Sequence, residues 1–145
     1  MLEYINFMVN TAKKGWRKER ECRKILEEQG YKIVFKSIRW RWGTLDLAGL
    51  FDTLAVRKIV KNHEPKLEWL FISNKHSTNY RKAHYTLIQA FIREFGIEEG
   101  VYEVWVWNKP KFVGRGVLRH WQNARWEVIS VTSNIPEIFN PEEAN

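Results

Sequence analysis

The amino-acid sequence predicts an α/β sandwich with a mixed central sheet. Three observations lead to this prediction. Two stretches, 16–29 and 79–95, carry the spacing of amphipathic helices. Short apolar or alternating stretches typical of strands lie between and after them. The second helix stands between two apolar strands, as a crossover connection does, so the order is helix, three strands, helix, strand and a late hairpin.

The first helix is predicted over 16–29 because its apolar residues recur on one side and charged residues fill the rest. Gly30 follows the last turn, where glycine commonly ends a helix. Glu19 lies one turn before Cys22, so we expect its face to border the buried stripe. That stripe is Trp16, Cys22, Ile25 and Leu26.

The strands that follow are predicted from alternation and from apolar runs. Residues 31–38 alternate lysine with apolar side chains and form the first strand, and the RWRWG stretch at 39–43 forms a basic, aromatic turn or strand tip. The second strand is placed at 44–50. Residues 52–65 are interpreted as an insertion with mixed signals, in which LAVRKIV is compatible with a continued strand and KNHEPK indicates a turn. Residues 67–74 are interpreted as a third, apolar strand.

The second half of the chain begins with an N-cap at 77–79 and a helix that ends near Phe95, before Gly96. Residues 101–107 form the fourth strand, and 112–118 and 125–132 are expected to pair as a hairpin. The apolar face of the helix is predicted to contain Ala83, Leu87, Ala90, Phe91 and Phe95.

The length of 145 residues indicates one domain over 1–145, with a single core. We place that core at about 13–107 and the late hairpin at 111–132. An acidic tail at 141–145 is expected to fray.

Composition and charge limit the classes of function that this chain is expected to have. The net charge of +7 and the pI near 9.6 favour an anionic partner, with nucleic acid the first candidate. The single cysteine, Cys22, excludes an internal disulfide and fits a reducing cytosol, so a cytoplasmic location is expected. No apolar run is long enough to cross a membrane. The four histidines and one cysteine have no zinc-site spacing, and no glycine-rich phosphate loop is present.

A carboxylate and a lysine stand at the ends of two predicted strands. Asp46 lies in the apolar stretch GTLDLAG, where an aspartate is costly unless it is paired or bound to a cation. Lys75 ends the stretch LEWLFISNK, where alternation places it on one face with Ser73 and puts Asn74 on the other. If the two strands are adjacent, these groups form a compact site that can hold a metal ion against a phosphate.

The order of these motifs resembles the restriction-endonuclease-like superfamily, the PD-(D/E)XK nucleases, and within it the archaeal-type Holliday junction resolvases. The resemblance covers about 13–107. It begins at KKGWRKERECRKILEEQGY, where Gly15, Glu19, Gly30 and Tyr31 match, continues at GTLDLAG, and ends at FISNK and the helix and strand that follow.

This resemblance implies a three-layer sandwich, with helices on both faces of the mixed sheet, and a homodimer that hydrolyses DNA phosphodiesters in recombination or repair. Glu19 and Asp46 would face a metal, usually Mg²⁺ with Mn²⁺ also possible, and Lys75 would stabilise charge at the phosphate or orient water. The ion would lower the pKa of water and neutralise the developing oxyanion.

The sequence departs from the family at Ser73, where an acidic residue is expected two positions before Lys75. Serine is a weak ligand for Mg²⁺, which prefers carboxylates and water. Three explanations stay open. The site works without this acid, another acid such as Asp52 or Glu68 replaces it, or the chain binds nucleic acid without cutting it.

Two basic clusters are expected to contact backbone phosphates, and they give affinity without sequence reading. Trp40 and Trp42 either stack on exposed bases or pack within their hairpin. The first hypothesis is a structure-selective endonuclease. The alternatives are a nuclease-derived nucleic-acid-binding protein and a basic protein-interaction module. The clusters are Lys13, Lys14, Arg17, Lys18 and Arg20, and Lys36, Arg39 and Arg41.

Overall fold

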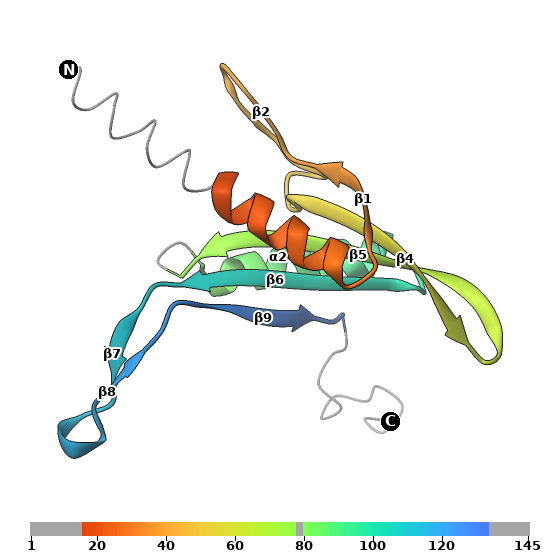
Figure 1. Cartoon of the computed structure of the whole chain (residues 1–145). Coiled ribbons are helices and arrows are strands. Elements are labelled where there is room, and N and C mark those ends of the chain that lie inside the picture. Colours follow the sequence, from red (N-terminus) through yellow and green to blue (C-terminus); the bar gives the residue numbers. More distant parts are fainter. Residues whose placement is uncertain (1–15, 78–79, 134–145) are drawn as a thin grey trace, which may run out of the picture.

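A mixed five-stranded sheet forms the centre of the computed structural model, which describes residues 16–77 and 80–133 (Figure 1). The strand order is β1-β4-β5-β6-β9, and β5 and β6 are parallel whereas all other neighbours are antiparallel. The bounds of these strands are β1 Lys32–Lys36, β4 Thr53–Lys61, β5 Glu64–His76, β6 Gly100–Asn108 and β9 Arg125–Val131.

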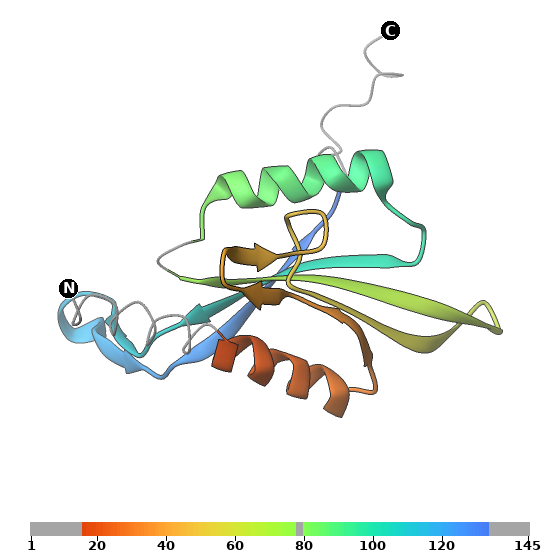
Figure 2. The same cartoon turned by 90° about the horizontal axis from the view of Figure 1, so that it is seen from above.

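Two helices cover opposite faces of this sheet, so the described chain has a helix, a sheet and a helix as three layers (Figure 2). The first helix, described over 16–28, packs Cys22 and Leu26 against Ala55, Leu70 and Ile72. Helix α2 (Lys82–Phe95) packs on the other face, where the buried side chains are Phe51, Ile88, Tyr102, Val104, Val106 and Val131. The predicted α/β sandwich with a mixed sheet is confirmed at this level.

Alternation along β5 separates the two faces as the sequence predicts. Ile72 belongs to the cluster beneath the first helix, and Phe71 packs against the cluster beneath α2. Because side chains alternate, Ser73 and Lys75 lie on the α2 face and Asn74 lies on the face of the first helix.

The predicted second strand at 44–50 is wrong. Only Gly43–Leu45 forms a strand, β3, and it pairs with β2 (Ile38–Trp40) in a separate two-stranded sheet. The chain then turns, because Ala48 and Gly49 adopt φ values of 55° and 67°, which no strand accommodates.

The stretch interpreted as an insertion, 52–65, is instead the central strand β4 and its turn. Thr53 to Lys61 pair in full register with β5, from Thr53 opposite Ile72 to Lys61 opposite Glu64. The strand adjacent to β5 is therefore β4, which is preceded by Asp52, and not the strand that precedes Asp46.

The predicted late hairpin is also wrong. Strand β7 (Lys111–Val113) pairs with the short β8 (His120–Gln122), and a 3₁₀ turn (Gly116–Leu118) lies between them. Strand β9 joins the edge of the central sheet beside β6. Residues after 107 contribute to the hydrophobic core, since Trp126 and Val131 pack into its two clusters.

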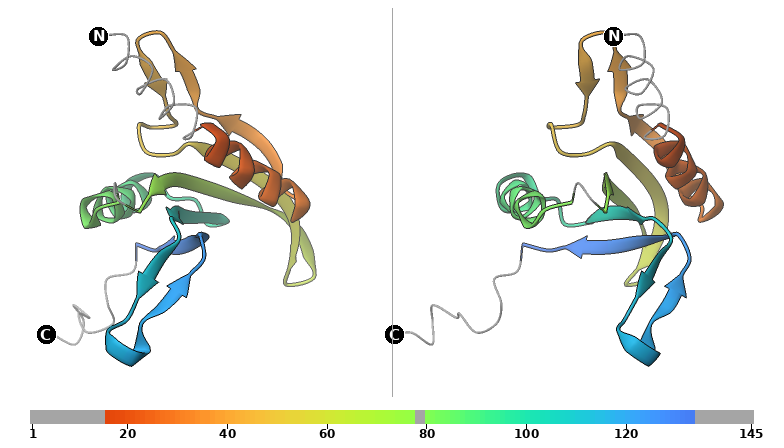
Figure 3. Two further views of the ribbon diagram at one scale, coloured as in Figure 1. Left: turned by 60° about the vertical axis from the view of Figure 1, so that its left-hand side comes forward. Right: turned by 90° about the vertical axis from the view of Figure 1, so that its left-hand side faces the viewer.

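The two small hairpins, β2–β3 and β7–β8, leave the same end of the central sheet and project to different sides of it (Figures 1 and 3). The register explains the shared end: β1 finishes opposite the start of β4, and β5 and β6 finish together with His76 opposite Trp107. We call these hairpins the β2–β3 arm and the β7–β8 arm.

Some predicted helix faces shift. Helix α2 begins at Lys82, with Arg81 at its N-cap, and it buries Ile88, whereas Leu87 and Phe95 are exposed. In the first helix, Trp16 is exposed rather than part of the buried stripe.

Several predictions lie outside the described residues, namely those for Lys13 and Lys14, for the N-cap at 78–79 and for the tail at 141–145. Within the described part of the chain, no helix has the length and apolar character needed to span a membrane.

Candidate active site

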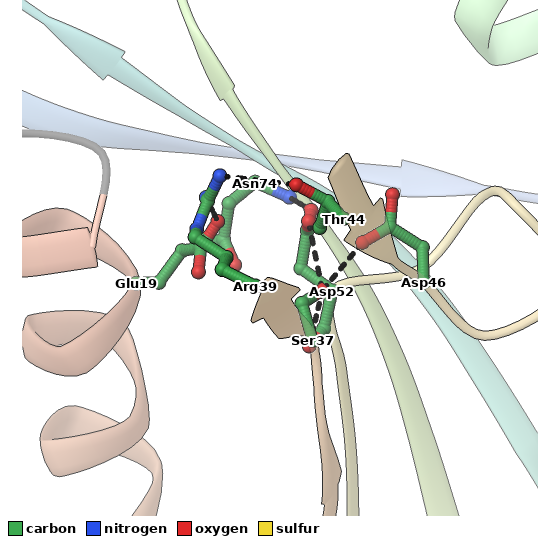
Figure 4. Close-up of polar contacts among 7 residues, drawn as sticks. All are labelled: Glu19, Ser37, Arg39, Thr44, Asp46, Asp52 and Asn74. Atoms are coloured by element: carbon green, nitrogen blue, oxygen red, sulfur yellow. Dashed lines mark hydrogen bonds and ion pairs between the residues drawn. The ribbon is translucent and has the colours of Figure 1, made fainter. Parts of the chain in front are cut away.

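Asp52 lies at the centre of a polar cluster where β1, β4 and β5 meet (Figure 4). It precedes β4, and its backbone N–H donates to the Ile72 carbonyl at 2.8 Å, which fixes it against β5. Its carboxylate oxygen Oδ2 accepts the backbone N–H of Asn74 at 2.6 Å. The sheet itself therefore holds this carboxylate in position.

Asp46 reaches the same place from the end of β3. The Ser37 hydroxyl donates to Asp46 Oδ1 at 2.6 Å, and it also lies 3.3 Å from Asp52 Oδ1 and 3.2 Å from the Asp52 carbonyl. A hydroxyl has one proton, so it satisfies one of these acceptors well at a time. Two carboxylates thus converge on a single weak donor, which is an arrangement that a cation stabilises.

Electrostatics set Asp52 apart from an ordinary surface aspartate. Burial raises the pKa of Asp52 to about 6, against a lowering by the hydrogen bond from Asn74. The negative charges of Glu19 and Asp46 raise this pKa further, and the positive charge of Lys75 lowers it. These effects show that the three predicted catalytic residues lie within electrostatic range of Asp52.

Glu19 contributes a third carboxylate from the first helix. It is 8% exposed, and burial raises its pKa, whereas the adjacent Arg39 lowers that pKa. The Arg39 guanidinium forms an ion pair with Glu19, donates to Thr44 Oγ1 at 3.4 Å and lies 5.7 Å from the Trp16 ring. These contacts make Arg39 part of the internal structure of the site, and its contact with DNA stays a prediction.

Of the two acidic residues that could replace the acid missing at Ser73, one lies in the cluster and the other does not. Glu68 accepts a hydrogen bond from Tyr31 and forms an ion pair with Arg57 at 3.2 Å. The Arg57–Glu68 pair lies four residue pairs along the β4–β5 register from Thr53, which follows Asp52, so Glu68 does not replace the missing acid. Asp52 does lie in the cluster. Ser73 is 2% exposed, on the α2 face of β5.

An open depression lies beside the carboxylates, between the first helix and the start of β2. Its volume is about 160 Å³, and its lining combines one carboxylate with four cationic side chains, a composition suited to a phosphate group. A second depression, of about 310 Å³, adjoins it through Arg23 and Lys36. The first is lined by Trp16, Glu19, Arg20, Arg23, Lys36, Ser37 and Arg39.

The β2–β3 arm extends beyond this depression and exposes its aromatic side chains. Trp40 is 54% exposed and Trp42 is 72% exposed, so the interpretation that both pack within the hairpin is wrong. The Arg41 guanidinium lies 4.9 Å from the Trp42 ring. Arg17 lies exposed on the first helix.

The chemistry of the cluster fits a hard cation in part. Carboxylate oxygens are the ligands that Mg²⁺ accepts, usually one or two of them with water and substrate phosphate completing the shell. Asp46 and Asp52 supply such a pair. Within 16–77 and 80–133, however, no group of three His, Cys, Asp or Glu side chains is arranged to hold a metal ion.

Three contributors were not identified from the sequence. Ser37 and Arg23 lie in ordinary strand and helix patterns, and the Asn74 backbone N–H carries no sequence signal. The oxygen and nitrogen atoms of the Asn74 side chain are buried, and the contact that the described structure gives them is with the weakly hydrogen-bonding Cys22 thiol.

Comparison with known proteins gave no match to a family model, to a curated protein or to a solved structure.

Proposed function

We propose that this chain is a metal-dependent DNA endonuclease with a restriction-endonuclease-like fold, selective for branched DNA and active as a homodimer. One observation carries the proposal: three carboxylates within mutual electrostatic range adjoin a depression lined by four cations. A metal-dependent site for phosphodiester hydrolysis uses this combination, because acids hold the metal and cations hold the phosphate. The helix–sheet–helix layering is compatible with the proposed fold.

In this proposal Asp52 and Asp46 are the residues that hold Mg²⁺ or Mn²⁺, and Glu19 adds negative charge beside them. When bound, the ion supplies a lowered pKa for water and charge neutralisation at the phosphate. Asp52 thus takes the principal role that the sequence analysis assigned to Asp46, because Asp52 is the residue fixed against β5.

The chain's own residues position the substrate. Arg20, Arg23 and Lys36 bind the phosphate in the depression. Lys75 approaches from β5 and stabilises negative charge near Asp52. Arg39 pairs with Glu19 and lowers its pKa, against the larger effect of burial, which raises it. Together these groups orient one phosphodiester against the carboxylates.

A second function, nucleic-acid binding without cleavage, is favoured by two specific observations. Ser73 is buried where an acid is expected, and the described residues hold no ready-made group of three metal ligands. In this second reading the cationic depression and the β2–β3 arm bind phosphate and bases, and the carboxylates are a remnant.

Incubation of the purified chain with labelled junction, flap, duplex and single-stranded DNA distinguishes the two functions. Each substrate is tested with Mg²⁺, with Mn²⁺ and with EDTA. Cutting that requires the metal and prefers branched substrates supports the endonuclease. Binding without cutting at every metal concentration supports the second function, and the absence of binding at low salt contradicts both.

A further inference from the structure

The β7–β8 arm belongs to a basic part of the sequence that the proposed active site does not use. Between Glu103 and Glu127 the chain contains no acidic residue. The same stretch contains five cationic residues, Lys109, Lys111, Arg115, Arg119 and Arg125. Lys111, Arg115 and Arg119 lie on the projecting arm itself, and Lys109 and Arg125 lie at its base. Such an unbalanced positive charge attracts a polyanion.

The tip of this arm presents two apolar side chains to solvent. Val117 is 102% exposed and Leu118 is 75% exposed, on the 3₁₀ turn between β7 and β8. The turn depends on glycines with φ of 88° at Gly114 and 57° at Gly116. A Cβ at Gly114 would come within 2.5 Å of the Leu118 carbonyl oxygen. The backbone therefore holds the two side chains outward in a defined shape.

An aromatic pair supports the arm below its tip. The rings of Phe112 and Trp121 meet edge to face, with centroids 5.0 Å apart, and both are more than half exposed. The Arg119 guanidinium lies 4.5 Å from the Phe112 ring. The β2–β3 arm shares one of these features, since Arg41 lies over the exposed Trp42.

We propose that the β7–β8 arm is a second DNA contact that recognises the branch point. Its cations bind phosphates of one DNA arm, and Val117 and Leu118 insert as a wedge against bases that are unstacked at the branch. Both arms project from the same end of the sheet (Figure 3), and in this proposal the DNA strand lies between them. This inference rests on the proposed function for its choice of DNA.

Charge favours DNA over a second copy of the chain as the occupant of this surface. A partner copy would carry the same net charge of +7 and would present the same acid-free stretch. Apolar tip contacts between copies would bring these cations together, which costs energy unless counterions or a polyanion intervene. With DNA as the partner, each cation that contacts a backbone phosphate instead makes binding more favourable.

Equilibrium binding of the full chain in EDTA tests the inference without depending on cleavage. Binding is measured over a salt series with a four-way junction and with a duplex of the same sequence, each labelled with 2-aminopurine at the branch position. Arg115→Gln with Arg119→Gln is expected to reduce the slope of log affinity against log salt by about 2. Val117→Ser with Leu118→Ser is expected to keep that slope, to lose the fluorescence increase at the branch and to reduce the junction preference about tenfold.

The matched controls lie at the tip of the β4–β5 hairpin, at the other end of the sheet, where Val60 is 77% exposed and Lys58 is exposed. Val60→Ser and Lys58→Gln are expected to change neither the slope nor the junction preference. Unchanged binding in both arm variants overturns the inference. So does a dimer, seen by sedimentation without DNA, that dissociates in Val117→Ser with Leu118→Ser. Failure of the wild type to cut DNA leaves these results standing and contradicts only the endonuclease.

Discussion

Asp52→Asn tests whether the ionised Asp52 carboxylate destabilises the folded protein when no metal ion is bound to offset its charge. The folded-state pKa of Asp52 is about 6, against 3.8 for the ordinary group, so folding disfavours the ionised form. The stability that the protonated Asp52 contributes is fully present below about pH 3.8 and is lost as the pH rises through about 6. A difference of about 2 pKa units corresponds to about 3 kcal/mol lost at neutral and higher pH.

The amide substitution removes this cost and retains the geometry. Its oxygen still accepts the Asn74 N–H, and its nitrogen can donate to the Ser37 hydroxyl oxygen. We expect Asp52→Asn to raise the free energy of unfolding by about 2–3 kcal/mol at about pH 8. The gain should shrink to about 1 kcal/mol at about pH 4.5, where the wild-type carboxyl is protonated in the folded state.

Urea denaturation in EDTA, followed by tryptophan fluorescence, measures this difference at both pH values. Glu98→Gln, which removes a carboxylate from an exposed turn, is the matched control and should change little. Addition of Mg²⁺ should stabilise the wild type, by about 1.4 kcal/mol at ten times the dissociation constant, and should not stabilise Asp52→Asn. A loss of stability in Asp52→Asn at about pH 8, or an equal gain at both pH values, would refute the reasoning.

Three further predictions concern the neighbours of Asp52. Asp46→Asn and Lys75→Ala should each lose cleavage and retain DNA binding in a gel-shift assay; unimpaired cutting by both would show that neither belongs to the site. Ser73→Glu places a carboxylate at a position that is 2% exposed. It should therefore cost about 3–5 kcal/mol in EDTA, with part recovered in Mg²⁺, and an equal loss with and without metal would show that the position does not reach the ion. Arg39→Ala leaves Glu19 buried without its partner and should cost about 2–4 kcal/mol at about pH 7. Because burial raises the Glu19 pKa, that cost should fall as pH decreases, and a pH-independent loss would contradict the role given to this ion pair.

Local patterns predicted the parts of the site that local structure determines. The amphipathic stripe of the first helix placed Glu19 at the edge of the core, where it is buried. Alternation in β5 placed Ser73 and Lys75 on one face, because a strand repeats every two residues whatever surrounds it. The single basic turn at RWRWG was found because charge and aromatic residues alternate there.

The parts that depend on long-range pairing were missed. The apolar run after Asp46 looks like a strand, but positive φ at Ala48 and Gly49 folds it into a turn and gives Asp52 the place beside β5. The pairing of β9 with β6, rather than with β7, joins segments whose local patterns are equally compatible with a hairpin. Burial in the core decides between these pairings, because β9 buries Val131 against the α2 side of the sheet when it pairs with β6.

The most direct test of the central claim is single-turnover cleavage of a labelled DNA junction in Mg²⁺. Wild type and Asp52→Asn are compared at enzyme concentrations that saturate the DNA, so that binding does not limit the rate. We expect Mg²⁺-dependent cutting by the wild type, abolition by EDTA, and a decrease of at least about 100-fold in Asp52→Asn, because it removes a metal-holding carboxylate. Equal rates in the two proteins, or no cutting by the wild type on any branched substrate, would contradict the account.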